Sequence, residues 1–403
     1  MYQEEQSNIN EEDEDTTINY QNWKKNAPLL YDTLITWELQ DISLCVNWFP
    51  KKDDSKKLYY VQKLILGTYS EGVNKDYLLI AKTILPNPTL KRSNKDIKDY
   101  NKEVVKEYAK IKNKIEIETK IRHEGEINKA KIMPQIKENK QLIATKTNKG
   151  EVNIFDYLKF SANENDDEIP KPTKILKGQT KIGYGLSWNP IEEGLIISSS
   201  YDHSICLWDI NSNKNDPLKK YNEHTLECED VCFSKKNGNI FLSCGDDKMI
   251  KIFDKRADKS MNSIEGHSDF INSIDLNSVN ENIYITGSKD NTIALWDLRK
   301  PELKLHSFIH HKEAVTNVRF NPNRENIFAS SGEDCKVLIW DLFQIGANIA
   351  RDDNDDASSE MIFEHSGHLD RINDIDWNLL ENMMIASVDN TKILHLWEMN
   401  AQI

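Results

Sequence analysis

The stretch YITGSKDNTIALWDL (residues 284–298) contains two short apolar runs, a polar turn with Asp and Asn, and a closing Trp-Asp pair. β-branched and aromatic residues on both sides of such a turn indicate a β-hairpin. Five other stretches have the same arrangement: LIATKTNKGEVNIFDY (142–157), IISSSYDHSICLWDI (196–210), FLSCGDDKMIKIFDK (241–255), FASSGEDCKVLIWDL (328–342) and MIASVDNTKILHLWEM (384–399). The sequence therefore predicts six copies of one hairpin unit.

Fixed spacing extends each unit upstream of its hairpin. In five units a bulky apolar residue stands 20 positions before the closing aromatic residue, which predicts a third strand. His recurs 29 positions before that aromatic residue, and Asp recurs six positions before it. These residues are His224, His267, His311 and His368, with Gln179 in the remaining unit, and Asp202, Asp247, Asp290 and Asp334. A His and an Asp in register can join a loop to a tight turn by hydrogen bonds, so we predict a structural role for them.

This pattern is typical of WD repeats and predicts a β-propeller with four-stranded blades. Before the first hairpin, four strand-like runs supply one more blade: SLCVNWF (43–49), YYVQKLILGT (59–68), DYLLIA (76–81) and KIEIETKI (114–121). The predicted fold class is therefore all-β, a seven-bladed propeller over residues 37–403 with an N-terminal α-helix. The last blade lacks an outer strand, and we expect LITWELQ (34–40) to supply it and close the ring.

Three segments stand apart from the repeats. Residues 1–19 carry seven acids and no base, so we expect residues 1–18 to be a disordered tail. Within residues 19–36, Ala27, Leu30 and Leu34 recur at helical spacing, which predicts the N-terminal helix. Residues 91–114 hold nine bases and four acids. We predict a solvated insertion there, with contact to nucleic acid or phosphate as the alternative.

The third segment, 346–362, is an acidic insertion loop. It contains four aspartates: Asp352, Asp353, Asp355 and Asp356. A calcium site is disfavoured, because Ala357 and Phe363 stand where a calcium loop needs Gly and a bidentate Glu. Clustered carboxylates can instead accept charge-assisted hydrogen bonds from Lys and Arg. We therefore predict contact with a basic peptide, with a merely solvated loop as the alternative.

Composition and motifs exclude several other functions. The chain has 52 Lys and Arg against 66 Asp and Glu, and this net charge of -14 disfavours a DNA-binding protein. Because no phosphate-cradling glycine-rich loop, HExxH motif or nucleophile elbow occurs, we predict no enzyme activity and no cofactor. His224, Cys228 and Cys232 lack a fourth zinc ligand nearby. No apolar run is long enough to predict a membrane span, and the six cysteines suit a reducing compartment, cytosol or nucleus.

Several segments together resemble the retinoblastoma-binding, MSI-type family of histone-binding WD-repeat proteins. They are NWKKNAPLLYD (22–32), KIRHEGEINKAKIMPQ (120–135), LIATKT (142–147), IGYGLSWNP (182–190), SICLWDI (204–210), ALWDLRKPELKLHSF (294–308) and the 349–368 loop that ends in EHSGH. The resemblance implies a histone-chaperone scaffold in the nucleus, with the cytoplasm as a further location. It also implies membership of complexes for chromatin assembly, chromatin remodelling and histone acetylation, deacetylation or methylation. The alternative is a WD scaffold for ribosome assembly or ubiquitin-ligase substrate recognition.

The resemblance further implies a groove for the first helix of histone H4, between the N-terminal helix and the acidic loop. Its apolar contacts are expected at Leu29, Leu30, Leu34 and Phe363, and its acceptors at Asp352, Asp353, Asp355 and Asp356. Packing against the last blade is the alternative role of the leucines. Ser358 and Ser359 replace a Pro-Pro pair of the family.

A second site is implied on the face around the central channel, where the family binds basic tails such as that of histone H3. The matching residues here are Glu126, Asn128, Tyr184, Glu229, Asp247, Asn272 and Arg371. Gln40, Ile182, Ala314 and Asn390 replace acids of the family, and Thr316 replaces an aromatic residue. Because each lost carboxylate removes a charge-assisted hydrogen bond, we expect weak binding of the usual tail or a preference for another ligand.

Overall fold

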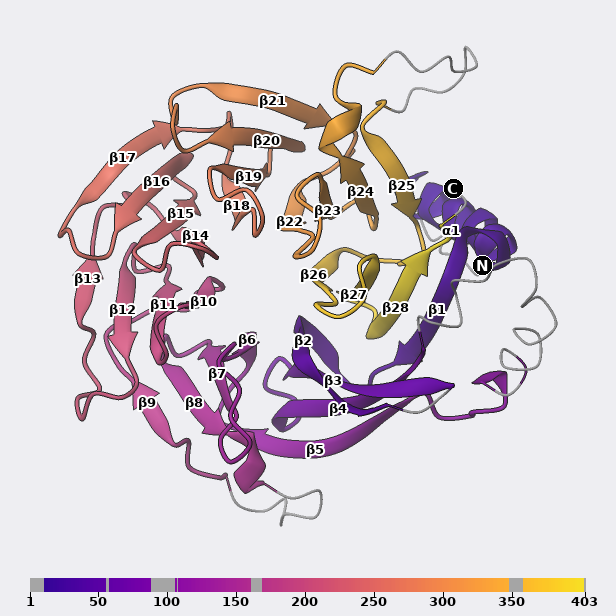
Figure 1. Ribbon diagram of the computed structural model, residues 1–403, viewed down its shortest axis with the longest axis horizontal. Coiled ribbons are helices and arrows are strands. Elements are labelled where there is room, and N and C mark those ends of the chain that lie inside the picture. The colour runs from indigo at the N-terminus through magenta and orange to yellow at the C-terminus, as the bar shows by residue number, and fades with distance from the viewer. Residues whose placement is uncertain are drawn as a thin grey trace, which may run out of the picture.

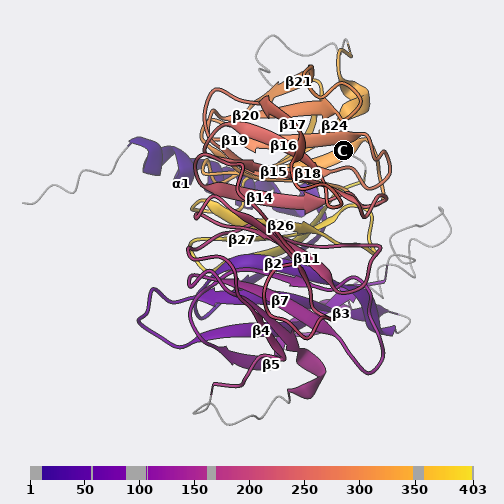
Figure 2. The ribbon, with the colours of Figure 1, turned by 90° about the vertical axis from the view of Figure 1, so that its left-hand side faces the viewer.

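Seven four-stranded antiparallel sheets stand as blades around one axis (Figures 1 and 2). The computed structural model describes residues 11–55, 58–87, 106, 108–160, 169–347 and 358–401. The seven blades and the N-terminal helix confirm the predicted fold class. Within this described part, no helix is both long enough and apolar enough to cross a membrane.

The blades follow one another along the chain. The first is β2 (Ile42–Ser55), β3 (Tyr59–Tyr69), β4 (Asp76–Pro86) and β5 (Ile115–His123); the second is β6 (Ile127–Ile132), β7 (Leu142–Thr147), β8 (Val152–Asp156) and β9 (Lys174–Leu176). The third is β10 (Leu186–Trp188), β11 (Leu195–Ser199), β12 (Ile205–Asp209) and β13 (Lys219–Tyr221); the fourth is β14 (Cys228–Phe233), β15 (Ile240–Gly245), β16 (Met249–Asp254) and β17 (Ser260–Glu265). The fifth is β18 (Ile271–Leu276), β19 (Ile283–Ser288), β20 (Thr292–Asp297) and β21 (Lys304–Ile309); the sixth is β22 (Val315–Phe320), β23 (Ile327–Gly332), β24 (Val337–Asp341) and β25 (Met361–His365). Short 3-10 helices η3 (Tyr157–Lys159) and η4 (Leu342–Gln344) follow β8 and β24.

The seventh blade joins the two ends of the chain. It consists of β26 (Ile372–Trp377), β27 (Met384–Asp389), β28 (Ile393–Met399) and β1 (Tyr31–Glu38). Strand β1 pairs antiparallel with β28, with Leu34 opposite Trp397 and Trp37 opposite Leu394. This pairing covers the edge of β28 and confirms that the segment around LITWELQ closes the ring.

The N-terminal helix has different bounds from those predicted. Helix α1 spans Glu11–Leu30, so residues 11–18 belong to the helix rather than to a tail, and residues 31–36 belong to β1. The acidic sequence of the first turn suits the positive end of a helix dipole. After Leu30, buried residues alternate with more exposed ones at Tyr31, Thr33 and Ile35, which is the period of a strand. Pairing with β28 thus overrides the helical spacing of Leu30 and Leu34.

The recurring His and Asp residues stabilise the blades internally, as predicted. In the fifth blade, His267 Nδ1 lies 3.1 Å from Asp290 and its Nε2 lies 2.8 Å from Thr286 Oγ1, which also accepts from Trp296 Nε1 at 2.9 Å. Equivalent bonds join His224 to Asp247, His311 to Asp334 and His368 to Asp389. The second blade lacks the Asp, as expected: His123 contacts Thr145 Oγ1 and the Gly125 carbonyl instead. Residues 91–105 and 107 of the Lys-rich insertion lie outside the described residues.

Candidate functional site

Helix α1 is fixed to the closing blade by one buried tryptophan. Trp23 is 8% exposed, donates its indole N–H to the Tyr31 hydroxyl at 2.7 Å, and stacks on His395 at 5.7 Å between ring centroids. A Cβ at Gly367 would lie 2.6 Å from the Trp23 ring, so this contact needs a glycine there. The helix therefore sits against the seventh blade, beside β25 (Figure 1).

A buried hydrogen-bond chain continues from Trp23 into the blade. The Tyr31 oxygen lies 2.6 Å from His365 Nδ1, and His365 Nε2 lies 3.0 Å from His395 Nδ1. Because the Tyr31 oxygen accepts from Trp23, its own hydrogen points to His365 Nδ1. A neutral His365 then carries its hydrogen on Nε2 and donates it to His395. This chain fixes α1 relative to β25 and β28.

His365, His395 and His368 form a cluster with the spacing of a metal site, since one ring nitrogen from each lies within 4.8 Å of the others. Both nitrogens of His365 are engaged with Tyr31 and His395. Both nitrogens of His368 are engaged with Asp389 and Ser387, at 2.9 Å and 2.7 Å. A metal ion would have to break these bonds, so we assign the cluster a structural role.

The chain makes stability depend on pH. Burial and the neighbouring imidazoles hold the pKa values of His365 and His395 well below the usual 6.5. As pH falls below about 6.5, the unfolded state binds protons that the folded state does not, so we expect stability to fall by up to about 1.4 kcal/mol per pH unit for each histidine. Unfolding free energies from urea titrations at pH 7.5, 6.5 and 5.5 measure this slope. The variant His395→Phe should show a shallower slope, and a constant stability over this range contradicts the assignment.

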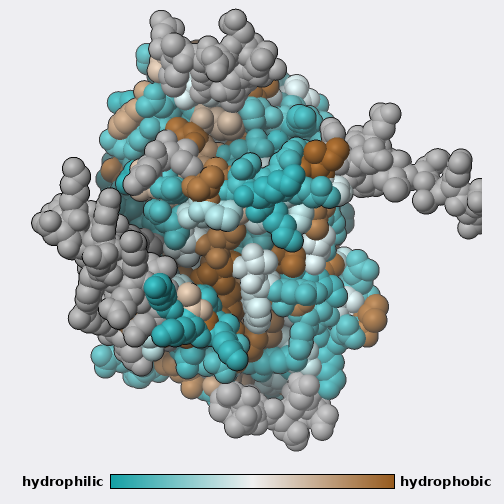
Figure 3. Space-filling view, turned by 90° about the vertical axis from the view of Figure 1, so that its right-hand side faces the viewer, coloured by the Kyte–Doolittle hydropathy of each residue, from teal (hydrophilic) through white to brown (hydrophobic). Residues whose placement is uncertain are grey.

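The side of the molecule that carries α1 also has an apolar surface. Phe363 of β25 packs edge-on against Tyr31 at 5.4 Å and stacks on Trp397 at 5.8 Å. Leu30, Leu34 and other half-buried apolar residues pack against the same cluster. Figure 3 faces this side and shows an apolar band bordered by hydrophilic surface.

The four predicted apolar contacts are therefore close together but differ in exposure. Leu29, near the end of α1, is 72% exposed, and Leu30 and Leu34 are half-buried. Phe363 is only 5% exposed, so it forms the floor under the surface rather than part of the surface itself. The predicted acceptors Asp352, Asp353, Asp355 and Asp356 lie outside the described residues.

The stem of the acidic loop is anchored beside this surface. Ser359 Oγ donates to the Gln344 carbonyl at 3.1 Å, and the Asp341 amide donates to the Glu360 carbonyl at 2.8 Å. The Glu360 carboxylate lies 2.8 Å from His306 Nε2, on the outer strand of the fifth blade. Side-chain hydrogen bonds thus fix the stem at the position where Ser358 and Ser359 replace the Pro-Pro pair.

Two comparisons with known families match these elements. Residues 19–87, which include most of α1 and all of β1, match the family model of the histone-binding protein RBBP4 or CAF1 complex component. The chain belongs to the histone-binding WD-repeat family. Residues 170–209, 215–254, 258–297 and 303–341 of this histone-binding WD-repeat protein match the WD domain, G-beta repeat model. Both matches confirm the resemblance seen in the sequence.

The channel face of this histone-binding WD-repeat protein contains a hollow of about 300 Å³ at the start of the inner strands. Five of the seven predicted residues line it: Asn128, Tyr184, Glu229, Asn272 and Arg371. Tyr69 and Tyr201 also line it, and the rings of Tyr184 and Tyr201 are 5.8 Å apart. Burial, opposed by a hydrogen bond from Tyr201 and reinforced by the Asp246 carboxylate, raises the pKa of Glu229 to about 8.

The other two predicted channel residues are placed differently. The prediction for Asp247 was wrong, because its carboxylate is buried and accepts from His224 Nδ1 at 2.9 Å and from the Thr225 amide at 3.1 Å. It belongs to the blade network and offers no free acceptor to a peptide. Glu126 does not line the hollow, and it accepts from Asn148 at 3.1 Å. Thr316 lines the hollow but donates to the Ile372 carbonyl.

Proposed function

We propose that this chain is a non-enzymatic nuclear scaffold that binds the first helix of histone H4 between α1 and the acidic loop. It then serves as a shared subunit of complexes that assemble or modify chromatin. The observation that supports this most directly is the shared apolar cluster of α1, β1 and β25. Ring closure brings the N-terminal helix to the stem of the acidic loop, although more than 300 residues separate them in sequence.

The chemistry of this surface suits a basic amphipathic helix. Such a helix lays its apolar face on a hydrophobic groove, and here the exposed Leu29 and the half-buried Leu30 and Leu34 provide the apolar side. The four aspartates of the adjacent loop supply acceptors for Lys and Arg side chains. The net charge of -14 also favours the approach of a basic partner.

The variant Leu29→Asp tests the apolar side of the groove. Because this side chain is 72% exposed, we expect no loss of folding stability, but a charge in the contact should weaken binding of an H4 first-helix peptide by about 10-fold or more. Isothermal titration calorimetry measures the affinity. The matched control is Ile309→Asp, which is 71% exposed on the fifth blade and should leave the affinity unchanged. Equal affinities of both variants and the wild type reject the groove and favour a WD scaffold of another pathway.

A second proposed contact is the channel-face hollow, for a basic tail such as that of histone H3. Glu229 and the rings of Tyr184 and Tyr201 provide one acidic group and an aromatic wall for a cationic side chain. With the other family acids replaced, we expect this contact to be weak.

A further inference from the structure

A second, larger hollow lies at the opposite end of the propeller axis. The inner strands of the blades all run away from the channel-face hollow, and this hollow is lined by the residues at their far ends, such as Trp48, Trp188 and Phe320. Its volume is about 420 Å³, and we call it the basal hollow. Asp230 and Arg319 line both hollows and lie between them.

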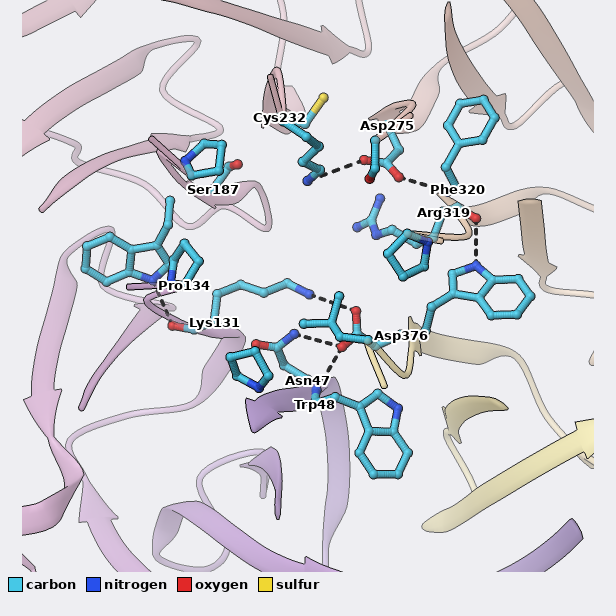
Figure 4. A pocket seen from close by; sticks show the side chains of 18 of the residues that line it. Asn47, Trp48, Lys131, Pro134, Ser187, Cys232, Asp275, Arg319, Phe320 and Asp376 are labelled. Carbon is cyan, nitrogen blue, oxygen red and sulfur yellow. Dashed lines mark hydrogen bonds and ion pairs between the residues drawn. The ribbon is translucent and has the colours of Figure 1, made fainter. Parts of the chain in front are cut away.

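Three cationic side chains from different blades surround the basal hollow. Lys131 and Arg319 reach from β6 and β22 towards its middle (Figure 4), and Lys235 follows β14. Within the described residues, the Lys131 and Lys235 ammonium groups make only ion pairs, 3.7 Å from Asp376 and 3.8 Å from Asp275, which are too long for hydrogen bonds. Among those same residues, Arg319 donates through only one terminal nitrogen, to Ser273, Val318 and Asp230. Most N–H donors of these three groups are therefore left unused by the part of the chain that the structure describes.

The aspartates of the hollow are engaged elsewhere. Asp376 Oδ2 accepts from the Trp48 amide and from Asn47, both at 2.8 Å, and so joins the seventh blade to the first. Asp275 Oδ2 accepts from the Phe320 amide at 2.9 Å and joins the fifth blade to the sixth. Because backbone N–H groups already occupy these oxygens, the hollow has more free donors than free acceptors. A donor surplus suits a ligand that carries carboxylates.

The walls of the basal hollow are apolar. Trp188 and Trp377 donate their indole N–H groups to the carbonyls of Lys131 and Arg319, both at 2.9 Å, so their polar atoms are already satisfied. Four prolines complete the rim: Pro50, Pro134, Pro190 and Pro322. A small anion would contact the ammonium groups but leave these walls in water. Apolar side chains next to the carboxylates would cover the walls.

We propose that the basal hollow binds an acidic peptide segment of a partner protein, with its carboxylates on Lys131, Lys235 and Arg319 and its apolar side chains on the Trp and Pro walls. This ligand has the opposite charge to a histone. The chain can then hold a basic histone at its rim and an acidic partner at its base at the same time.

The test uses the full-length protein and an array of acetylated, amidated hexapeptides. In one set Asp or Glu alternates with Leu, Phe or Trp, and in the matched set Asn or Gln replaces the acids. We expect binding to the acidic set only. Fluorescence anisotropy with the best peptide should show a loss of about 10-fold or more in the variant Lys131→Met/Lys235→Met, because two charge-assisted contacts are removed. The control Lys300→Met changes an exposed lysine away from the hollow and should have no effect.

Further measurements separate this site from folding and from the histone groove. The double lysine variant should keep the wild-type affinity for the H4 peptide. If that variant does not fold, Leu379→Ser replaces it, because Leu379 lines the hollow and is 43% exposed, and it should weaken the acidic peptide. Equal binding of the acidic and amide sets, or an unchanged affinity in the variant used, overturns the proposal. Binding of inositol hexakisphosphate through the same lysines without any acidic peptide overturns it too, in favour of a small-anion site.

Discussion

Replacing the four loop aspartates together, as Asp352→Asn, Asp353→Asn, Asp355→Asn and Asp356→Asn, is expected to reduce affinity for the H4 first-helix peptide by about 100-fold or more. Each carboxylate that accepts from Lys or Arg contributes roughly 1.5 to 3 kcal/mol, so losing even two such bonds gives this factor. Binding of the wild type should weaken as salt rises, whereas the residual binding of the variant should depend little on salt. Calorimetric titrations at 50, 150 and 400 mM NaCl measure both effects.

A matched charge control separates local contact from general attraction. The substitutions Asp216→Asn, Glu281→Gln, Glu302→Gln and Glu325→Gln remove the same number of negative charges from exposed positions elsewhere on the propeller. These changes should lower only the association rate, and only slightly, because long-range steering is screened. Equal losses of affinity in both quadruple variants would show that the loop acts only through net charge and not as a wall of the groove.

The sequence predicted most of the fold, because each blade repeats its own pattern. The register of His, Asp and the closing aromatic residue located five blades, and the unpaired last blade indicated the role of LITWELQ. The helix boundary was wrong for a physical reason: Ala27, Leu30 and Leu34 have helical spacing, but Leu34 reaches the same cluster from a strand. The alternation of Tyr31, Thr33 and Ile35 is the local signal that could have corrected it.

The candidate sites were less predictable, because they form where distant segments meet. The repeat register could have excluded Asp247 from the channel face, since the same register already paired it with His224. The burial of Phe363 depends on Tyr31 and Trp397, which ring closure brings to it. The basal hollow has no motif at all, since each blade contributes only a few scattered residues to it.

Deleting residues 1–38 is expected to prevent folding of the propeller, whereas deleting residues 1–22 should not. The longer deletion removes β1, exposes the edge of β28, and uncovers apolar residues such as Leu394, Leu396 and Trp397, which are fully buried in the intact blade. Exposing each such side chain costs about 1.5 to 3 kcal/mol, so several of them exceed much of the roughly 5 to 15 kcal/mol that stabilises a typical domain. An uncovered edge strand also promotes aggregation.

The shorter deletion ends just before Trp23, so it leaves the Trp23–Tyr31 contact and the whole of β1 in place. Solubility, size-exclusion elution and the thermal unfolding midpoint of both truncated chains measure the difference. A synthetic peptide of residues 23–40, added during refolding, should restore the longer deletion, because it supplies the missing strand in trans. A monomeric 39–403 chain with a melting temperature close to that of the wild type would mean that the other three strands hold the seventh blade without β1. The H4 groove would then need a different explanation for the position of α1, since β1 is the element that carries the helix to β25.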